Sequence, residues 1–262
     1  MTDWNRYREI DALRESGHPT EALVEFENLR ASATDAADVS SILLGESLSY
    51  RDLGRFGKAA EAAAEAIRLL PQESPSRPYA EFSLACVHES ESKFDLAAQE
   101  FETLLKRHAD LLSTGEYIQF RRGVQLRLIA NLIVLGQGLE LLSIADGLKK
   151  EDISAEERAE LSYREAQAHG LLGRQDHALK LYQEAAGGPL ERSLAARAHF
   201  HIGEVLYDRA EFSRALDEFK TAEGLAEAGN PDRELFAKWI DHTSRTVAND
   251  KPIHGPSVQR EN

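Results

Sequence analysis

The sequence predicts an all-α protein, built as a right-handed superhelical solenoid of antiparallel helix pairs. A pattern occurs six times: a small or turn-forming residue, Ala or Leu five positions later, an aromatic residue or Ala four further on, and Leu or Ala three after that. Successive copies lie 37, 38, 44, 37 and 37 residues apart, a period typical of stacked supersecondary units. Helix-forming Ala, Leu, Glu and Arg dominate the 262 residues, which supports helices as the repeated elements.

Each copy of the pattern is expected to mark the junction and the second helix of one pair. The six sets are Gly17/Ala22/Phe26/Leu29, Gly54/Ala59/Ala63/Ala66, Ser92/Ala97/Phe101/Leu104, Gly136/Leu141/Ala145/Leu148, Gly173/Ala178/Tyr182/Ala185 and Ala210/Ala215/Phe219/Ala222. They predict one continuous array over residues 1–248, with repeats near 3–34, 40–73, 78–110, 117–150, 155–187 and 192–226. A capping helix is expected over 231–247, and a disordered tail over 249–262.

The second repeat shows why the pattern predicts helices. Apolar residues between Ile42 and Leu53 form a wide helical face, and Gly54 can adopt the left-handed conformation that ends a helix. The next helix begins near Phe56, and Pro71 ends it. Its packed side is nearly all Ala, because small side chains let two helices approach closely.

The remaining elements have signals of their own. Ser154 and Glu157 fit a capping box at the start of a helix, and Asn230-Pro231 fits an N-cap followed by Pro at the first helical position. The 44-residue gap implies about seven extra residues between Leu105 and Ile118, which we expect to form longer helices or a loop.

Charge and composition restrict the possible functions. The net charge of −14 and the isoelectric point of about 5.1 argue against a nucleic-acid partner, because phosphate backbones would be repelled. The single cysteine, Cys86, excludes an intramolecular disulfide framework and suits a reducing compartment. Neither a secretory signal nor an apolar run long enough for a membrane helix is visible, so we expect a cytoplasmic protein without a membrane partner.

The repeats resemble the tetratricopeptide repeat (TPR) family. In the second repeat, Tyr50, Gly54, Ala59, Ala66 and Pro71 match the family pattern almost position for position. The sixth repeat also matches closely. The fourth departs most, with Leu at the usual Ala and Gly at a usual aromatic position, and the common spacing of 37 residues exceeds the family's 34.

The resemblance implies a function in protein binding. In TPR arrays the first helix of each pair lines a concave surface, which usually holds an extended peptide or a helix of a partner. The positions that the resemblance assigns to this groove are Trp4, Tyr7, Leu44, Arg51, Tyr79, Phe82, Leu126, Tyr163, Arg197, Phe200, Glu204 and Tyr207. Aromatic side chains recur among them and would be good anchors; alternatively, they fill the inner wall of the solenoid themselves.

No catalytic, cofactor or metal site is predicted. His199 and His201 point about 200° apart on a helix and cannot share a metal ion, whereas His88 and His169 have the phase of residues packed between helices. The sequence therefore favours a non-catalytic cytoplasmic scaffold or adaptor with a protein or peptide partner. Alternatives are a peptide-sensing regulator, similar to bacterial TPR quorum receptors, and a self-associating structural protein that forms homo-oligomers.

Overall fold

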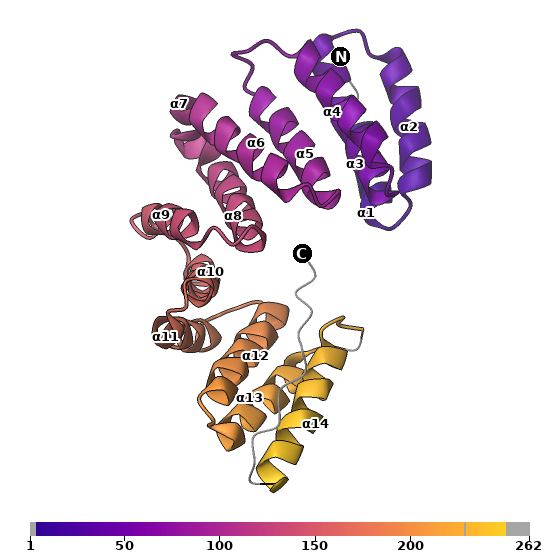
Figure 1. Ribbon diagram of the computed structural model, residues 1–262. Helices are drawn as coiled ribbons and strands as arrows, with labels where there is room; N and C mark the ends of the chain where they lie inside the picture. The colour runs from indigo at the N-terminus through magenta and orange to yellow at the C-terminus, as the bar shows by residue number, and fades with distance from the viewer. Residues whose placement is uncertain (1–3, 228, 250–262) are drawn as a thin grey trace. The chain divides into compact units, whose positions relative to one another are not determined.

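The computed structural model describes residues 4–227 and 229–249, and every regular element in them is a helix (Figure 1). Helices adjacent in sequence pack in pairs, which confirms the predicted all-α solenoid of antiparallel helix pairs. Contacts divide the chain into two compact units, Met1–Asn131 and Leu132–Asn262, which we describe separately. The expected tail beyond Asn249 lies outside the described residues, and a single continuous array stays a prediction.

The N-terminal unit contains three helix pairs, a short connector and most of a further helix. The pairs are α1 (Trp4–Glu15) with α2 (Pro19–Ser32), α3 (Ala36–Asp52) with α4 (Phe56–Leu69), and α5 (Arg77–Ser90) with α6 (Phe94–Arg107). The connector consists of α7 (Ala109–Leu112) and the 3-10 helix η1 (Gly115–Tyr117), which leads into α8 (Ile118–Val134). The extra residues of the 44-residue gap therefore form these two short helices.

The C-terminal unit begins with the last residues of α8. It continues through α9 (Gly138–Leu148), α10 (Ala155–Leu171), α11 (Gln175–Ala186), α12 (Arg192–Asp208), α13 (Phe212–Leu225) and α14 (Arg233–Asn249). Ser154 and Glu157 form the predicted capping box at the start of α10. The prediction that Asn230 is the N-cap and Pro231 the first helical residue is wrong, because α14 begins at Arg233. The Asn230 side chain does accept a hydrogen bond from the Asp232 amide at 2.8 Å, but both Asn230 and Pro231 precede the helix.

The first residue of every repeated set occupies the turn between two helices and has a positive φ. The values are 91° for Gly17, 69° for Gly54, 61° for Ser92, 72° for Gly136, 70° for Gly173 and 61° for Ala210. This left-handed conformation lets the chain reverse and satisfies carbonyls at the helix end. Ser92 and Ala210 adopt it although a Cβ makes it unfavourable.

The core forms where the small residues of the pattern let helices meet. The second residue of each set is completely buried. A Cβ added to Gly45 on α3 would lie 2.5 Å from the ring of Phe26 on α2, and one added to Gly203 on α12 would lie 2.5 Å from the ring of Phe219 on α13. At both places an aromatic ring occupies the space that a side chain would need.

Helix α14 packs against α13 in the C-terminal unit. Phe236 and Trp239 are buried against the sixth set, with the Trp239 ring centroid 5.2 Å from that of Phe219. Its exposed side carries charged residues, including an ion pair between Lys238 and Glu234. The helix thus covers apolar surface that α13 would otherwise expose.

Candidate functional site

A groove of about 880 Å³ lies in the C-terminal unit. Its walls come from the end of α8 and the following turn, from α10, α11 and α12, and from α14. The lining residues are Ile133, Val134, Leu135, Gly136, Gln167, Gly170, Leu171, Gln175, Tyr182, Phe200, His201, Glu204, Val205, Asp208 and Leu235. We call this cavity the C-terminal groove.

One part of the C-terminal groove is apolar and accessible. Val134 is 48% exposed and Leu171 is 39% exposed, and both line the same groove. Val205 and Phe200 of α12 line the groove as well but are buried, and Leu235 of α14 is half-buried. Val134, Leu171 and Leu235 offer apolar surface that a ligand could cover.

The charged groups of the C-terminal groove are carboxylates on one face of α12. Glu204 and Asp208 are four residues apart, so their side chains lie one above the other. Oε2 of Glu204 lies 2.7 Å from Nδ1 of His201. Within residues 4–227 and 229–249, Asp208 has no hydrogen bond or ion pair. Partial burial, and then the neighbouring charge of Glu204, raise the pKa of Asp208.

A side-chain amide also lines the groove. Oε1 of Gln167 on α10 is buried, and it has no hydrogen-bond partner in the described part of the chain. A buried polar atom without a partner costs free energy, and a ligand that reached this atom would recover that cost.

Aromatic packing holds His201 in place. Its ring stacks on Tyr182 with centroids 5.1 Å apart and 24° between the planes, and it lies 6.1 Å from the ring of Tyr163. Burial raises the pKa of Tyr163 to about 12 and raises that of Tyr182 further, so both phenols are neutral. They act as a rigid wall, and His201 can orient Glu204.

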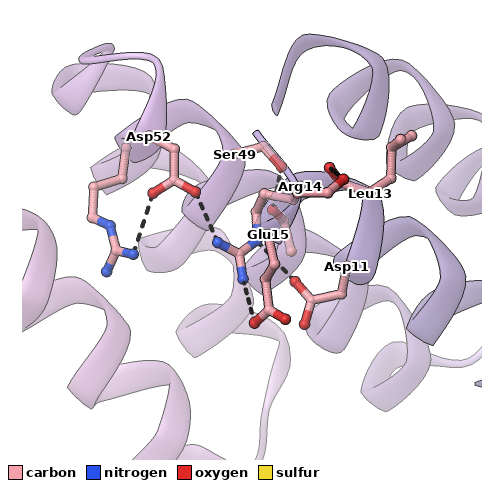
Figure 2. Close-up of polar contacts among 9 residues, drawn as sticks. Asp11, Leu13, Arg14, Glu15, Ser49 and Asp52 are labelled. Atoms are coloured by element: carbon pink, nitrogen blue, oxygen red, sulfur yellow. Dashed lines mark hydrogen bonds and ion pairs between the residues drawn. The ribbon is translucent and has the colours of Figure 1, made fainter. Parts of the chain in front are cut away.

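Charged side chains of α1 and α3 pair with one another in the N-terminal unit. Figure 2 shows Arg14 of α1 between carboxylates: its Nε donates to Asp11 at 2.8 Å, its Nη1 to Asp52 of α3 at 2.8 Å, and its Nη2 to Glu15 at 3.3 Å. Asp52 also accepts a hydrogen bond from Arg51 at 3.3 Å. The Arg14 side chain is only 11% exposed, so these ion pairs are partly screened from water.

A second paired group lies between α5 and α8 of the same unit. Glu89 accepts hydrogen bonds from Nη1 of Arg127 and Nδ2 of Asn131, both at 2.9 Å. The nearby thiol of Cys86 is buried, and burial raises its pKa to about 11. Cys86 is therefore a protonated, unreactive thiol at neutral pH.

The N-terminal unit also has an aromatic cluster. Tyr79, 42% exposed, has its ring centroid 4.3 Å from that of Phe120 and 6.1 Å from that of Tyr117. Phe82 lies 5.5 Å from Phe120 and 5.7 Å from Phe101. Tyr79 is thus the accessible edge of a self-packed cluster.

The twelve expected groove residues fall into several environments. Phe200 and Glu204 line the C-terminal groove, whereas Tyr163 is buried behind it. Tyr207 is buried under α14, and its hydroxyl lies 2.7 Å from Nε2 of His242. Arg197 is exposed and donates to Asp232 at 2.5 Å. Tyr163, Phe200 and Tyr207 are thus largely covered by side chains of their own unit.

The other expected residues belong to the N-terminal unit. Trp4 is exposed and lies 5.6 Å from Tyr7, whose ring packs 5.2 Å from Phe26. Half-buried side chains are Leu44, Arg51, Phe82 and Leu126. The structure does not gather these residues into one pocket.

Sequence reasoning did not identify Asp208, His201, Val134 or Leu171 as groove residues. Asp208 could have been identified from the sequence, because it lies one helical turn after Glu204, which was predicted. Val134 and Leu171 end the first helices of the fourth and fifth pairs, where family positions give no guide.

Neither a metal site nor a membrane-spanning helix is found among the described residues. No group of three or more His, Cys, Asp or Glu side chains there could hold a metal ion. In the same residues, no helix is both long and apolar enough to cross a bilayer.

Comparisons with known proteins identify the repeat. Residues 7–78 match the family model described as tetratricopeptide repeat. Residues 7–78 therefore contain tetratricopeptide repeats. The matched region includes the second repeat, whose residues carry the family pattern, and TPR proteins typically serve as protein-interaction scaffolds rather than catalysts.

Solved TPR structures have the same fold at low sequence identity. The C-terminal part of a TPR protein from Cytophaga hutchinsonii is 12% identical with a TM-score of 0.60, covering 93% of this chain and 89% of that one. A TPR protein from Parabacteroides merdae is 17% identical with a TM-score of 0.58, covering 91% and 84%. The TPR-like repeats of a putative kinesin light chain from Podosopora anserina are 17% identical with a TM-score of 0.59, covering 74% and 94%. No curated protein matches the chain.

Proposed function

We propose that this protein is a scaffold whose C-terminal groove holds a segment of a partner protein. The observation that carries the proposal is the groove itself, about 880 Å³ of space beside exposed Val134 and Leu171. Such a volume suits a few side chains of an extended segment. Accessible apolar surface next to polar groups is the usual composition of a binding site.

The architecture supports a binding role further. The groove is formed largely by packed helices, so its shape exists before a ligand arrives and little ordering free energy is lost on binding. The buried Tyr163 and Phe200 support the helix that carries the polar groups. We therefore assign these two aromatics to the wall rather than to direct contact.

The exposed aromatics of the N-terminal unit are proposed as additional contacts. Trp4 and Tyr79 are 45% and 42% exposed, and rigid aromatic side chains lose little entropy when a partner covers them.

A peptide selection tests the proposed function. A phage library of random 12-residue peptides is selected on the purified full chain, and the affinities of enriched peptides are measured by fluorescence polarisation. The double variant Val134→Ala/Leu171→Ala removes about five methylene-sized groups, each worth up to about 0.8 kcal/mol when buried. We expect at least a tenfold loss of affinity.

The matched control is Val24→Ala/Leu139→Ala, which truncates two exposed side chains of the same types outside the groove. It is expected to keep the wild-type affinity. Equal losses in both double variants, or no enriched peptide that depends on the groove, would refute the proposed function.

A further inference from the structure

We propose that the C-terminal groove selects a protein segment in which a Lys or Arg side chain lies beside an apolar one, with the cation placed at Glu204 and Asp208. This inference rests on the proposed function and specifies its ligand. It depends on the charges of the groove, the pairing of neighbouring residues and the apolar surface beside the carboxylates.

The groove lining contains carboxylates but no ammonium or guanidinium group among the described residues. Of its described lining residues, Glu204 and Asp208 are acidic, and none is Lys or Arg. A single His201 lies at hydrogen-bond distance from Glu204. Two carboxylates one helical turn apart repel each other, and a cation placed between them would remove that repulsion.

Three basic side chains of the same unit form ion pairs with carboxylates other than Glu204 and Asp208. Arg209 follows Asp208 directly in the sequence, yet its Nη2 donates to Asp176 on α11 at 2.5 Å. Arg197 donates to Asp232, and Lys149 pairs with the buried Glu165. Asp176, Asp232 and Glu165 of the same unit thus have partners within the chain, whereas Asp208 has none within the described residues. An external cation is the complement that this site lacks.

The apolar surface fits the rest of a basic side chain. Leu171, Val205 and Leu235 line the same groove as the two carboxylates. The methylene stem of Lys or Arg can cover apolar surface while its charged end reaches a carboxylate. A neighbouring apolar residue of the ligand can contact Val134, and a backbone amide can reach Gln167. A protein segment therefore fits better than a small cation.

Charge also opposes other ligands. The chain has a net charge of −14, and the groove adds two carboxylates without a lining Lys or Arg. Nucleic acids, phosphorylated segments and acidic lipid surfaces would be repelled here. The sign of the groove therefore favours basic segments.

Matched peptides test the inference on the full chain. From the selected pool, a peptide with one Lys or Arg is compared with the same peptide carrying Gln at that position. We expect wild-type protein to bind the basic peptide at least tenfold more tightly. The Glu204→Gln/Asp208→Asn variant should bind both peptides about equally, and added salt should narrow the wild-type difference.

A charge-matched variant controls for long-range attraction. Asp217→Asn/Glu223→Gln removes the same number of negative charges from α13, away from the groove lining, and should keep the preference for the basic peptide. Loss of preference in this control as well would mean that net charge alone attracts the peptide, which overturns the inference.

The outcomes separate the two proposals. Groove-dependent peptides without a basic preference would refute the basic ligand and leave the proposed function intact. Absence of any groove-dependent binding would refute both.

A chain ending at Asn249 tests whether the segment beyond it, which carries Lys251 and Arg260, occupies the groove. If that deletion strengthens peptide binding at least tenfold, the occupant is the chain's own segment and the partner proposal is wrong.

Discussion

The paired charges of the N-terminal unit and the groove of the C-terminal unit both lie on packed helices, but their charges are arranged differently. In the first, Arg14 is held by Asp11, Asp52 and Glu15, and Glu89 is held by Arg127 and Asn131. In the second, Glu204 has an imidazole beside it, and Asp208 has no partner among the described residues.

This difference indicates that the C-terminal groove, rather than the paired charges of the N-terminal unit, has charged groups available to a ligand. Paired charges already have their best partners, so a ligand gains little by replacing them. Unpaired carboxylates repel each other in the free protein, and this repulsion lowers stability until a cation binds. The same fold can therefore support a closed face and an open one.

The largest expected effect tests what the two regions share, the close contact of a glycine with an aromatic ring. Gly45→Ala in α3 and Gly203→Ala in α12 each place a Cβ about 2.5 Å from a buried Phe ring. Overpacking of this kind should lower the free energy of unfolding by about 1–3 kcal/mol, measured by urea denaturation.

The controls are the same substitution at helical glycines with open space, Gly57→Ala in α4 and Gly224→Ala in α13. These should raise the stability by about 0.5–1 kcal/mol, because Ala favours helices. The same sign at all four positions would contradict the proposed packing.

The paired charges of the N-terminal unit are tested by Arg14→Ala. Its removal leaves Asp11 and Asp52 close together without their main cation, at a cost of about 1–2 kcal/mol in unfolding free energy. Arg51→Ala serves as the control: it leaves the Arg14–Asp52 pair in place and should cost less than about 0.5 kcal/mol. Equal costs for the two variants would show that Arg14 does not organise these charges.

One substitution in each unit tests the turns. Ser92→Gly and Ala210→Gly remove the Cβ that makes the left-handed backbone conformation unfavourable; φ is 61° at both residues. Each should stabilise the protein by about 0.5–1 kcal/mol in thermal or urea unfolding, since Gly adopts this conformation without a Cβ contact. Gly54→Ala, at an equivalent turn, should destabilise by a similar amount. A loss on Ser92→Gly would mean that the serine side chain contributes more than its backbone costs.

The smallest effect should come from Asp208→Asn. A carboxyl whose folded pKa lies above its unfolded value of 3.8 favours folding below that value, and this contribution is lost as the pH rises through the folded pKa. The variant should therefore have a slightly higher Tm than wild type at pH 7, and the gain should disappear below about pH 4. Asp52→Asn, which weakens an ion pair, should lower the Tm at pH 7 instead.

Local patterns predicted the repeated structure well. Gly54 and Ala59 have strong backbone or packing requirements that depend on close neighbours, so their turn and core positions could be read directly from the sequence. Ser92 and Ala210 show that position in the repeat determines the left-handed turn even without glycine. The capping box at Ser154 was predictable for the same reason, because its partner is three residues away.

The groove was harder to predict, because side-chain direction changes by about 100° from one helical residue to the next. Phe200 and His201 are adjacent, yet the first is buried and the second lies beside Glu204. Burial of Tyr207 depends on α14, which is more than twenty residues away in the sequence. Such placements follow from tertiary packing, which a repeat pattern does not specify.

Methyl NMR of the Val- and Leu-labelled full chain, titrated with the selected basic peptide, tests the central claim most directly. The account predicts saturable shifts for Val134, Leu171, Val205 and Leu235, with Val24 and Leu139 unchanged. Shifts confined to methyl groups of the N-terminal unit, or no saturable shift in the groove, would contradict it.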